Sequence, residues 1–328
     1  MATYGRFESH VAVTAACVIG FAASWMVTNI GAIASQISSS YDISLAAVGL
    51  LTTALFISLA AVQIPGGKAS DRWGARQVGL VGSGIMIAGC AMALPAPDLI
   101  LGLVARFITG IGAGLAFIAG AAYVRSTGGS ALAQGLFGGI ATASGGVALA
   151  VVPLLEIKFG WQAPYISGLA LSLLGLIVLL AAPVDTQHLQ RAGKRAAGVL
   201  KDRRLYKLAI LFSATFGLSV ILGNWVVELL ERNAGASSTT AGAVGSLTLL
   251  LAVFSRPLGG WLLRRHPETI RLTVGISIVI GAVGTLLLML AEPLWIAAIG
   301  AVLIGIGGGV SFSPAFTGAA VLLSLIHI

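Results

Sequence analysis

Five polar side chains lie inside long apolar stretches of this 328-residue sequence, where a polar group is costly and is a candidate for function. Arg106 and Arg256 are charged, and Gln63, Asn29 and Asn224 carry side-chain amides. A planar guanidinium holds an oxyanion through two parallel N–H bonds, whereas an amide offers neutral donors and an acceptor. These residue types predict binding of a small anion.

Residues of the kinds that do catalysis or hold metals are scattered. The four histidines stand at positions 10, 188, 266 and 327, far apart from one another. Cys17 and Cys90 lie in apolar segments with no second ligand at a metal-binding spacing, which is typical of buried, unreactive thiols. The sequence therefore predicts no metal site, no cofactor and no enzymatic activity.

The elements that must position the polar groups follow from composition. Hydrophobic residues make up 57% of the chain and charged residues only 9%, with a mean hydropathy of +1.00. A soluble domain carries about 25% charged residues, so a soluble enzyme, a nucleic-acid binder and a secreted disulfide scaffold are excluded. Ten uncharged or nearly uncharged intervals are each long enough for one membrane-spanning helix; they are 11–41, 43–67, 77–97, 99–124, 126–155, 159–184, 208–227, 233–255, 272–291 and 293–326. The prediction is an all-α integral membrane protein with about ten spans.

Basic residues set the predicted orientation. Most of the 19 lysines and arginines fall in alternate loops, which a cytoplasmic N-terminus places inside, whereas the outer loops hold only Lys158 and Arg232. We therefore expect a multi-pass protein of the cell membrane. The longest hydrophilic stretch, 184–207, is predicted to be a basic cytoplasmic linker near anionic lipid. It separates an N-terminal six-helix bundle (1–183) from a C-terminal bundle (208–328).

An internal repeat relates the two parts at a nearly constant separation of about 195 residues. Asn29 corresponds to Asn224, and the Ala-Val-Gly run ending at Gly49 corresponds to the one ending at Gly245. The glycine pair 66–67 matches 259–260, and the run 110–114 matches 305–309. Two duplicated six-helix halves explain these matches. On this basis the second half lacks about two helices, and we expect a truncated frame with a foreign C-terminal end.

A motif in the loop after the second span gives the most specific signal. The run Gly67-Lys-Ala-Ser-Asp71-Arg72-Trp-Gly74-Ala-Arg76 resembles the signature loop of the major facilitator superfamily. We expect Gly67 and Gly74 to supply positive φ in a tight turn. The resemblance implies two six-helix bundles, and it implies that Asp71, Arg72 and Arg76 latch one conformation. The alternative is that these charges only anchor the topology.

Further segments resemble members of the same superfamily. Arg106 followed by Gly110, Gly112 and Gly114 resembles the second motif of the superfamily. The run Phe159-Gly160-Trp161 also resembles a segment found in the superfamily. We interpret the three glycines as a helix-packing surface and not as a dinucleotide-binding loop, because they lie within an apolar span. The segments around Arg256 and Gln63 resemble the corresponding helices of nitrate/nitrite porters. Those porters carry arginine at both positions, so Gln63 argues against nitrate itself.

These observations together predict a secondary transporter that works by alternating access on a small inorganic or organic anion. Its expected partners are that solute, the bilayer and a coupling ion, either a proton or a counter-anion. Efflux of amphipathic compounds is the main alternative, although the fifth span lacks the Gly-Pro pair of drug antiporters. A membrane receptor and a membrane enzyme are further alternatives. Glu228 and Glu156, near span ends, are expected to be interfacial groups and not proton relays.

Overall fold

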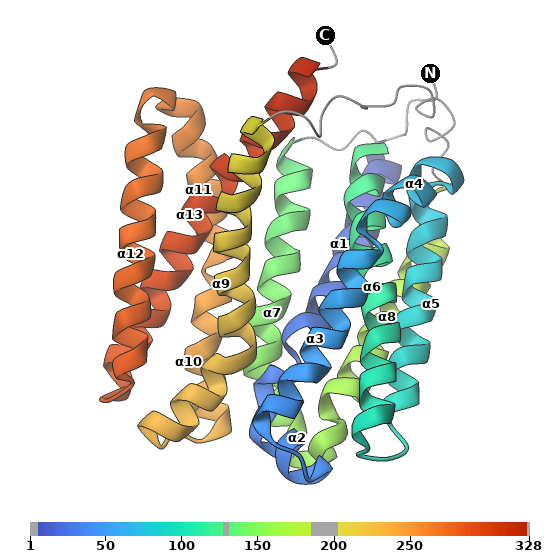
Figure 1. The fold of residues 1–328 in the computed structure, drawn as a ribbon. Helices are drawn as coiled ribbons and strands as arrows, with labels where there is room; N and C mark the ends of the chain where they lie inside the picture. The colour runs from blue at the N-terminus through green and yellow to red at the C-terminus, as the bar shows by residue number, and fades with distance from the viewer. Residues whose placement is uncertain (1–5, 127–130, 185–202, 327–328) are drawn as a thin grey trace.

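The computed structural model describes residues 6–126, 131–184 and 203–326, and these are mostly helical, with no strand among them. Figure 1 shows the helices running up and down between two faces. Their bounds are α1 Arg6–Thr28, η1 Gly31–Ile33, α2 Ala34–Tyr41, α3 Leu45–Ala61, α4 Gln63–Trp73, α5 Ala75–Ala93, α6 Leu99–Ser126, α7 Ala131–Phe159, η2 Gly160–Gln162, α8 Ala163–Ala181, α9 Arg203–Ala234, α10 Ser238–Leu250, α11 Ala252–Arg265, η5 Pro267–Thr269, α12 Ile270–Leu290 and α13 Leu294–Ile326.

Judged by the length and composition of the helices, the structure has fewer candidate membrane spans than the ten intervals of the sequence predict. Among the described residues, seven segments are long and apolar enough to cross a membrane, or eight when the bent pair of α3 and α4 counts as one. One of the seven, Leu136–Ala181, contains most of α7 and all of α8, which run in opposite directions (Figure 1). The count of ten therefore stays a prediction.

Two of the predicted spans each consist of two consecutive helices. Val62 separates α3 from α4 with a bend of 46°, and Leu251 separates α10 from α11. Pro65 and Pro257 stand shortly after these breaks, where each removes a backbone N–H donor and so favours a kink.

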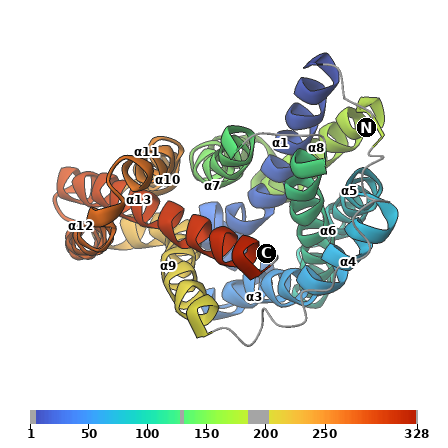
Figure 2. The same ribbon diagram turned by 90° about the horizontal axis from the view of Figure 1, so that it is seen from above.

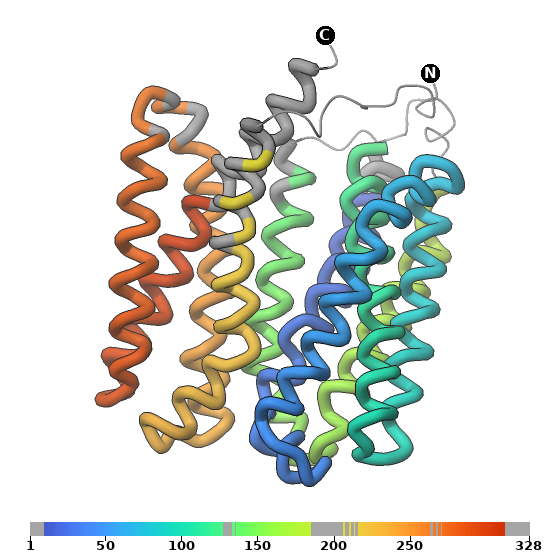
Figure 3. Tube along the Cα trace, in the orientation of Figure 1, coloured from blue at the N-terminus to red at the C-terminus, as the bar shows by residue number. Residues whose placement is uncertain are grey.

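The helices form two groups that meet along α7. Seen from above in Figure 2, α1, α3–α6 and α8 gather on one side, and α9–α13 gather on the other. Helix α7 packs against α1 in the first group and against α10 in the second. The trace in Figure 3 follows the same division along the chain. Most of the predicted linker, 185–202, lies outside the described residues.

One face of the molecule collects the basic segments. The start of α1, the α4–α5 junction, the end of α8, the start of α9 and the α11–α12 junction all lie at the top of Figure 1. The α2–α3, α5–α6, α9–α10 and α12–α13 connections lie at the opposite face. We call the first the basic face and the second the distal face. The arrangement agrees with consecutive spans that run in alternating directions between the two faces. The orientation of the basic face toward the cytoplasm stays a prediction.

The glycine runs hold helices at close range in both halves. A Cβ on Gly110 would lie 2.2 Å from the Leu55 carbonyl oxygen of α3, and one on Gly112 would lie 2.6 Å from the Gly82 carbonyl oxygen of α5. Gly114 likewise meets Val62 at 2.4 Å, at the α3–α4 break. Only glycine permits such approaches of one backbone to another.

The second half repeats this packing. Cβ atoms on the corresponding glycines of α13 would meet α10 (Gly305, 2.7 Å from the Leu247 carbonyl), α12 (Gly307, 2.5 Å from the Ser277 carbonyl) and α11 (Gly309 against the Ser255 hydroxyl). The duplicated sequence motif is thus a duplicated set of helix contacts.

Candidate functional site

Arg106 lies in the interior of the first helix group. Its side chain is only 1% exposed, and it donates hydrogen bonds to the Asn29 amide oxygen (3.3 Å) and to the Met26 carbonyl oxygen (2.6 Å). Its Nε atom has no hydrogen-bond partner among the described residues. Asn29 follows the end of α1, where the helix has left carbonyl groups unpaired. Arg106 therefore ties α6 to the C-terminal end of α1.

Asn29 extends this connection to α8. Its side-chain nitrogen donates to the Pro164 carbonyl oxygen at 3.0 Å, and the residue is fully buried. Sequence analysis proposed both Arg106 and Asn29 as substrate ligands. The structure brings them together inside one bundle with protein partners, and their role toward a substrate stays a prediction.

An aromatic cluster closes the distal end of this bundle. The hydroxyls of Tyr41 and Tyr165 lie 3.2 Å apart, and the Trp161 ring packs edge-on against both, with centroid distances of 5.5 and 6.2 Å. Gly160, with φ of +55°, makes the turn that brings Trp161 there. The Phe159-Gly160-Trp161 segment is therefore a turn that carries a packing residue.

Asn224 joins the two helix groups. Its side-chain oxygen accepts a hydrogen bond from the Thr52 hydroxyl of α3 at 3.0 Å, and its nitrogen donates to the Val220 carbonyl of its own helix at 2.9 Å. A Cβ on Gly31 would lie 2.3 Å from the Asn224 Cα atom, so the α9 backbone touches the break after α1. Both repeat-related asparagines thus border this break, Asn29 within it and Asn224 from the other group.

Gln63 and Arg256, the other repeat-related pair, have different surroundings. Gln63 is exposed and donates to the Leu59 carbonyl one turn earlier in the chain, at 3.3 Å. Arg256 of α11 is partly buried and reaches the Gly138 carbonyl of α7 at 3.4 Å. It also borders a cavity of about 10 Å³ with Ser219, Thr248 and Ile304. Gln63 and Arg256 therefore contact different helices, α3 and α7.

The signature-loop residues are mostly helical, and one expectation about them is wrong. Gly67 lies within α4 and has no positive φ, because the helix continues to Trp73 before it turns. The turn rests on Gly74 alone, with φ of +92°. A Cβ on Gly67 would meet nothing within 4 Å, so neither backbone conformation nor packing requires glycine there.

The charged residues of that motif divide into two kinds. Arg76 donates to the Leu179 and Leu180 carbonyl oxygens, both at 2.9 Å, and so satisfies the C-terminal end of α8. Asp71 and Arg72 are exposed, and within the described part of the chain no ion pair includes them. The latch that the resemblance implies stays a prediction.

Sequence analysis missed a polar cluster on the distal face, which we call the distal triad: Ser35 of α2 with Glu228 and Glu231 of α9. The Ser35 hydroxyl contacts a carboxylate oxygen of Glu228 and lies 2.8 Å from one of Glu231. Arg232 pairs with Glu228. Glu228 is only 6% exposed, and the expectation that it is an interfacial group and not a proton relay stays a prediction. In the sequence, the only sign of this cluster was an acidic side chain near the end of a span. Its partner Ser35 is 193 positions away along the chain.

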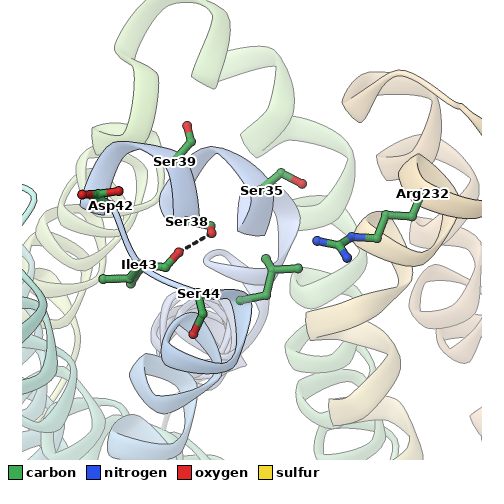
Figure 4. A pocket seen from close by; sticks show the side chains of 8 residues that line it. Ser35, Ser38, Ser39, Asp42, Ile43, Ser44 and Arg232 are labelled. Carbon is green, nitrogen blue, oxygen red and sulfur yellow. Dashed lines mark hydrogen bonds between the residues drawn. The ribbon is translucent and has the colours of Figure 1, made fainter.

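A pocket with a volume of about 500 Å³ opens beside this triad. Figure 4 shows Ser35, Ser38, Ser39 and Ser44 around the α2–α3 connection, with Arg232 of α9 reaching toward them. No group of three or more metal-ligating side chains occurs in the parts of the chain that the structure describes.

Comparison with known proteins places this architecture among membrane transporters. The family model described as Major Facilitator Superfamily matches residues 16–324. A probable sulfoacetate transporter of Cupriavidus necator is 26% identical over 90% of this chain and 75% of its own length. The multidrug resistance protein MdtL of Citrobacter koseri is 27% identical over 87% of this chain and 74% of its own.

The predicted likeness to nitrate porters and the predicted all-helical fold of the superfamily are also confirmed. A probable nitrate transporter of Staphylococcus epidermidis is 26% identical over 56% of this chain and 48% of its own length. The xylose transporter XylE from Escherichia coli, in a partially occluded inward-open conformation, has a TM-score of 0.70 at 16% identity, covering 97% of this chain and 89% of its own. The chain therefore belongs to the major facilitator superfamily.

Proposed function

We propose that this protein is a secondary transporter of a small inorganic or organic anion, with Arg256 as the group that recognises the negative charge. The observation that carries the proposal is the contact between the Arg256 guanidinium of α11 and the Gly138 carbonyl of α7. Because α7 packs on both helix groups, rocking of one group against the other changes the surroundings of this guanidinium.

Arg106 is the less suitable anion ligand. It is buried within one bundle, and its hydrogen bonds to Asn29 and Met26 stay within that bundle. A substrate that withdrew Arg106 from these partners would leave buried acceptors unpaired, which costs about 1–3 kcal/mol. We therefore assign Arg106 and Asn29 to positioning, and Arg256 to binding, with Asn224 and Gln63 as candidate polar contacts.

The relatives support an anion but do not identify it. The names of two of them give sulfoacetate and nitrate, both anions, as substrates. Uptake of an anion into a negatively charged cell requires compensation, so we propose cotransport of a proton or exchange for a counter-anion. We further propose a cytoplasmic basic face in the cell membrane, with bundles 1–183 and 208–328 joined by the linker 184–207.

Uptake into proteoliposomes tests the assignment, with radiolabelled sulfoacetate and nitrate as probes. Arg256→Ala removes charge-assisted hydrogen bonds worth about 1.5–3 kcal/mol and should lower uptake at limiting substrate by about ten- to a hundred-fold. Arg256→Lys should restore part of it, because the charge returns without the planar fork. Arg265→Ala, an exposed arginine at the end of the same helix, is the matched control. Retained uptake in Arg256→Ala would overturn the assignment.

Efflux of amphipathic compounds is the second candidate. The likeness to a multidrug resistance protein favours it, as does the apolar part of the cavity wall at Arg256, formed by Leu218, Leu249 and Ile304. Cells that express the protein would then accumulate less of a fluorescent amphipathic dye than cells without it. Arg256→Ala would leave this difference in place, because no anionic charge is being recognised.

A further inference from the structure

Four exposed side chains form a stripe along one side of α11 that ends at the basic face. Phe254, Leu258, Trp261 and Arg265 stand four, three and four residues apart, the spacing that keeps side chains on one side of a helix. Phe254 is 76% exposed, Leu258 46% and Trp261 45%, and Arg265 is exposed as well. We call these four residues the α11 stripe.

The other sides of α11 contact protein. The Ser255 hydroxyl donates a hydrogen bond to the Gly305 carbonyl of α13 at 2.8 Å, and a Cβ on Gly259 would touch the α13 backbone. Arg256, which stands about 200° around the helix from Phe254, reaches α7. The α11 stripe therefore faces away from both α13 and α7, and in a membrane it faces lipid.

The length of the stripe matches one leaflet of a bilayer. The helical rise places Phe254 about 16 Å from Arg265 along the axis. The hydrocarbon core of a bilayer is about 30 Å thick, so one leaflet contributes about 15 Å. Arg265 is the last residue of α11 and lies at the basic face (Figure 1). The stripe thus offers apolar side chains along the depth of one acyl chain and a cation at the level of the headgroup.

The polar end of the stripe is suited to an anion. The Arg265 guanidinium lies over the Trp261 ring, 5.4 Å from its centroid, and this contact holds the charge beside the stripe. Arg271, in the first turn of α12, is a second exposed cation at the same junction. Within the described part of the chain neither arginine has an acidic partner, because Glu268 pairs with His266. Both guanidinium groups are therefore available to a phosphate.

We propose that the α11 stripe binds an anionic phospholipid from the leaflet at the basic face. Arg265 donates charge-assisted hydrogen bonds to the lipid phosphate, and an acyl chain lies along Trp261, Leu258 and Phe254. A zwitterionic lipid has the same chain and phosphate but carries its own cation, so it binds the arginine less well. The site is on the outer surface of α11 and does not depend on which solute is transported.

The first half of the chain supplies a matched comparison. With Gly66 aligned to Gly259, four exposed residues of α3 and α4 correspond to the stripe: Ala61, Pro65, Lys68 and Arg72. They retain positive charge near the basic face but include no aromatic or large apolar side chain. Lys68→Gln therefore removes one exposed charge from the repeat-related position and leaves the α11 stripe intact.

Quenching of tryptophan fluorescence by phospholipids with brominated chains tests the proposal. The protein is reconstituted into phosphatidylcholine vesicles in which the same minor fraction of lipid is either brominated phosphatidylglycerol or brominated phosphatidylcholine. Each protein is measured with and without Trp261→Phe, and the difference isolates the quenching of Trp261 from that of the other tryptophans. The ratio of the two lipids' quenching gives their relative affinity at the stripe.

Phosphatidylglycerol should be preferred about fivefold, the effect of about one positive charge at a membrane surface. Arg265→Gln should remove most of this preference. Arg265→Lys should retain part of it, because the charge remains without the planar guanidinium. Lys68→Gln should keep the full preference, because it changes the net charge equally but lies outside the stripe.

Equal quenching of Trp261 by the two lipids in the parent protein would overturn the proposal. So would equal losses of preference in Arg265→Gln and Lys68→Gln, because net charge alone would then explain the effect. Absence of quenching by either lipid would show that protein, such as a second copy of the chain, covers the stripe, and would overturn it as well.

This test and the test of anion uptake are independent. Lipid quenching needs no transported solute, so it is unaffected if the solute is not an anion. In vesicles of phosphatidylcholine alone the stripe has no anionic lipid to bind, so Arg265→Ala remains a suitable control for uptake there. Failure of uptake refutes the proposed function alone, and failure of the lipid preference refutes the lipid site alone.

Discussion

The close approach of α6 to α3 allows a quantitative test of the glycine run. In Gly110→Ala the new Cβ would lie 2.2 Å from the Leu55 carbonyl oxygen and 2.1 Å from the Ser58 hydroxyl oxygen. The hydroxyl moves by a change of rotamer, but the carbonyl belongs to the α3 backbone. The helices must therefore separate by about 1 Å to restore an ordinary contact.

This overpacking costs about 1–3 kcal/mol, against a gain of about 0.5–1 kcal/mol from replacing glycine by alanine within a helix. The expected net loss is about 0–2.5 kcal/mol, centred near 1 kcal/mol, and each kcal/mol lowers the melting temperature by about 2–4 °C for a domain of this size. The change should affect stability before it affects substrate affinity, because Gly110 contacts another helix and not the Arg256 region.

Unfolding is measured in detergent with a thiol-reactive fluorescent dye, for which the chain supplies its own probes. Cys17 and Cys90 are only 7% and 2% exposed and react when the bundle opens. Gly84→Ala is the matched control, since it also lies within a helix but its Cβ would meet nothing within 4 Å. The control should melt at or above the parent temperature. If Gly110→Ala melted together with Gly84→Ala, the packing argument would be refuted.

Two other substitutions follow from contacts described above, and the same melting assay measures both. Arg106→Leu should destabilise the protein by about 1–3 kcal/mol, because Asn29 and the Met26 carbonyl lose a buried donor; an unchanged melting temperature would contradict the positioning role. Gly74→Ala should cost about 1–3 kcal/mol, because φ of +92° is strained for a residue with a Cβ, whereas Gly67→Ala should cost nothing; equal effects of the two would show that the turn is not the constraint.

The fold was largely predictable because the bilayer imposes strong rules on sequence. Uninterrupted apolar intervals of span length predict helices, and the spacing of basic residues predicts which ends share a face. The repeat was also readable, since glycines that hold backbones together tolerate few substitutes. Gly110 and Gly305 occupy corresponding contacts, on α3 and α10 respectively.

The site was less predictable, because a sequence gives the depth of a residue in the membrane but not the direction of its side chain. Arg106 and Arg256 read alike, yet one bonds within its bundle and the other reaches α7. We predicted that Gly67 lies in a turn, because the motif is known as a loop. In the structure α4 continues through this residue. The distal triad was invisible, since its contacts join residues almost two hundred positions apart.

The duplicated halves agree at the glycines that pack helices together and differ at the neighbouring polar positions 63 and 256. A Cβ on Gly66 would touch the Leu115 side chain at 3.0 Å, and one on Gly259 would touch the Val310 carbonyl at 2.3 Å, so both glycines serve the same helix pair in their own half. The neighbouring positions 63 and 256 carry different residue types, glutamine in the first half and arginine in the second. Gln63 donates to the Leu59 carbonyl of the preceding helix, α3, so an amide there leaves the packing intact. Selectivity in this chain is therefore expected to depend on positions adjacent to the packing glycines, where one half changes without its counterpart.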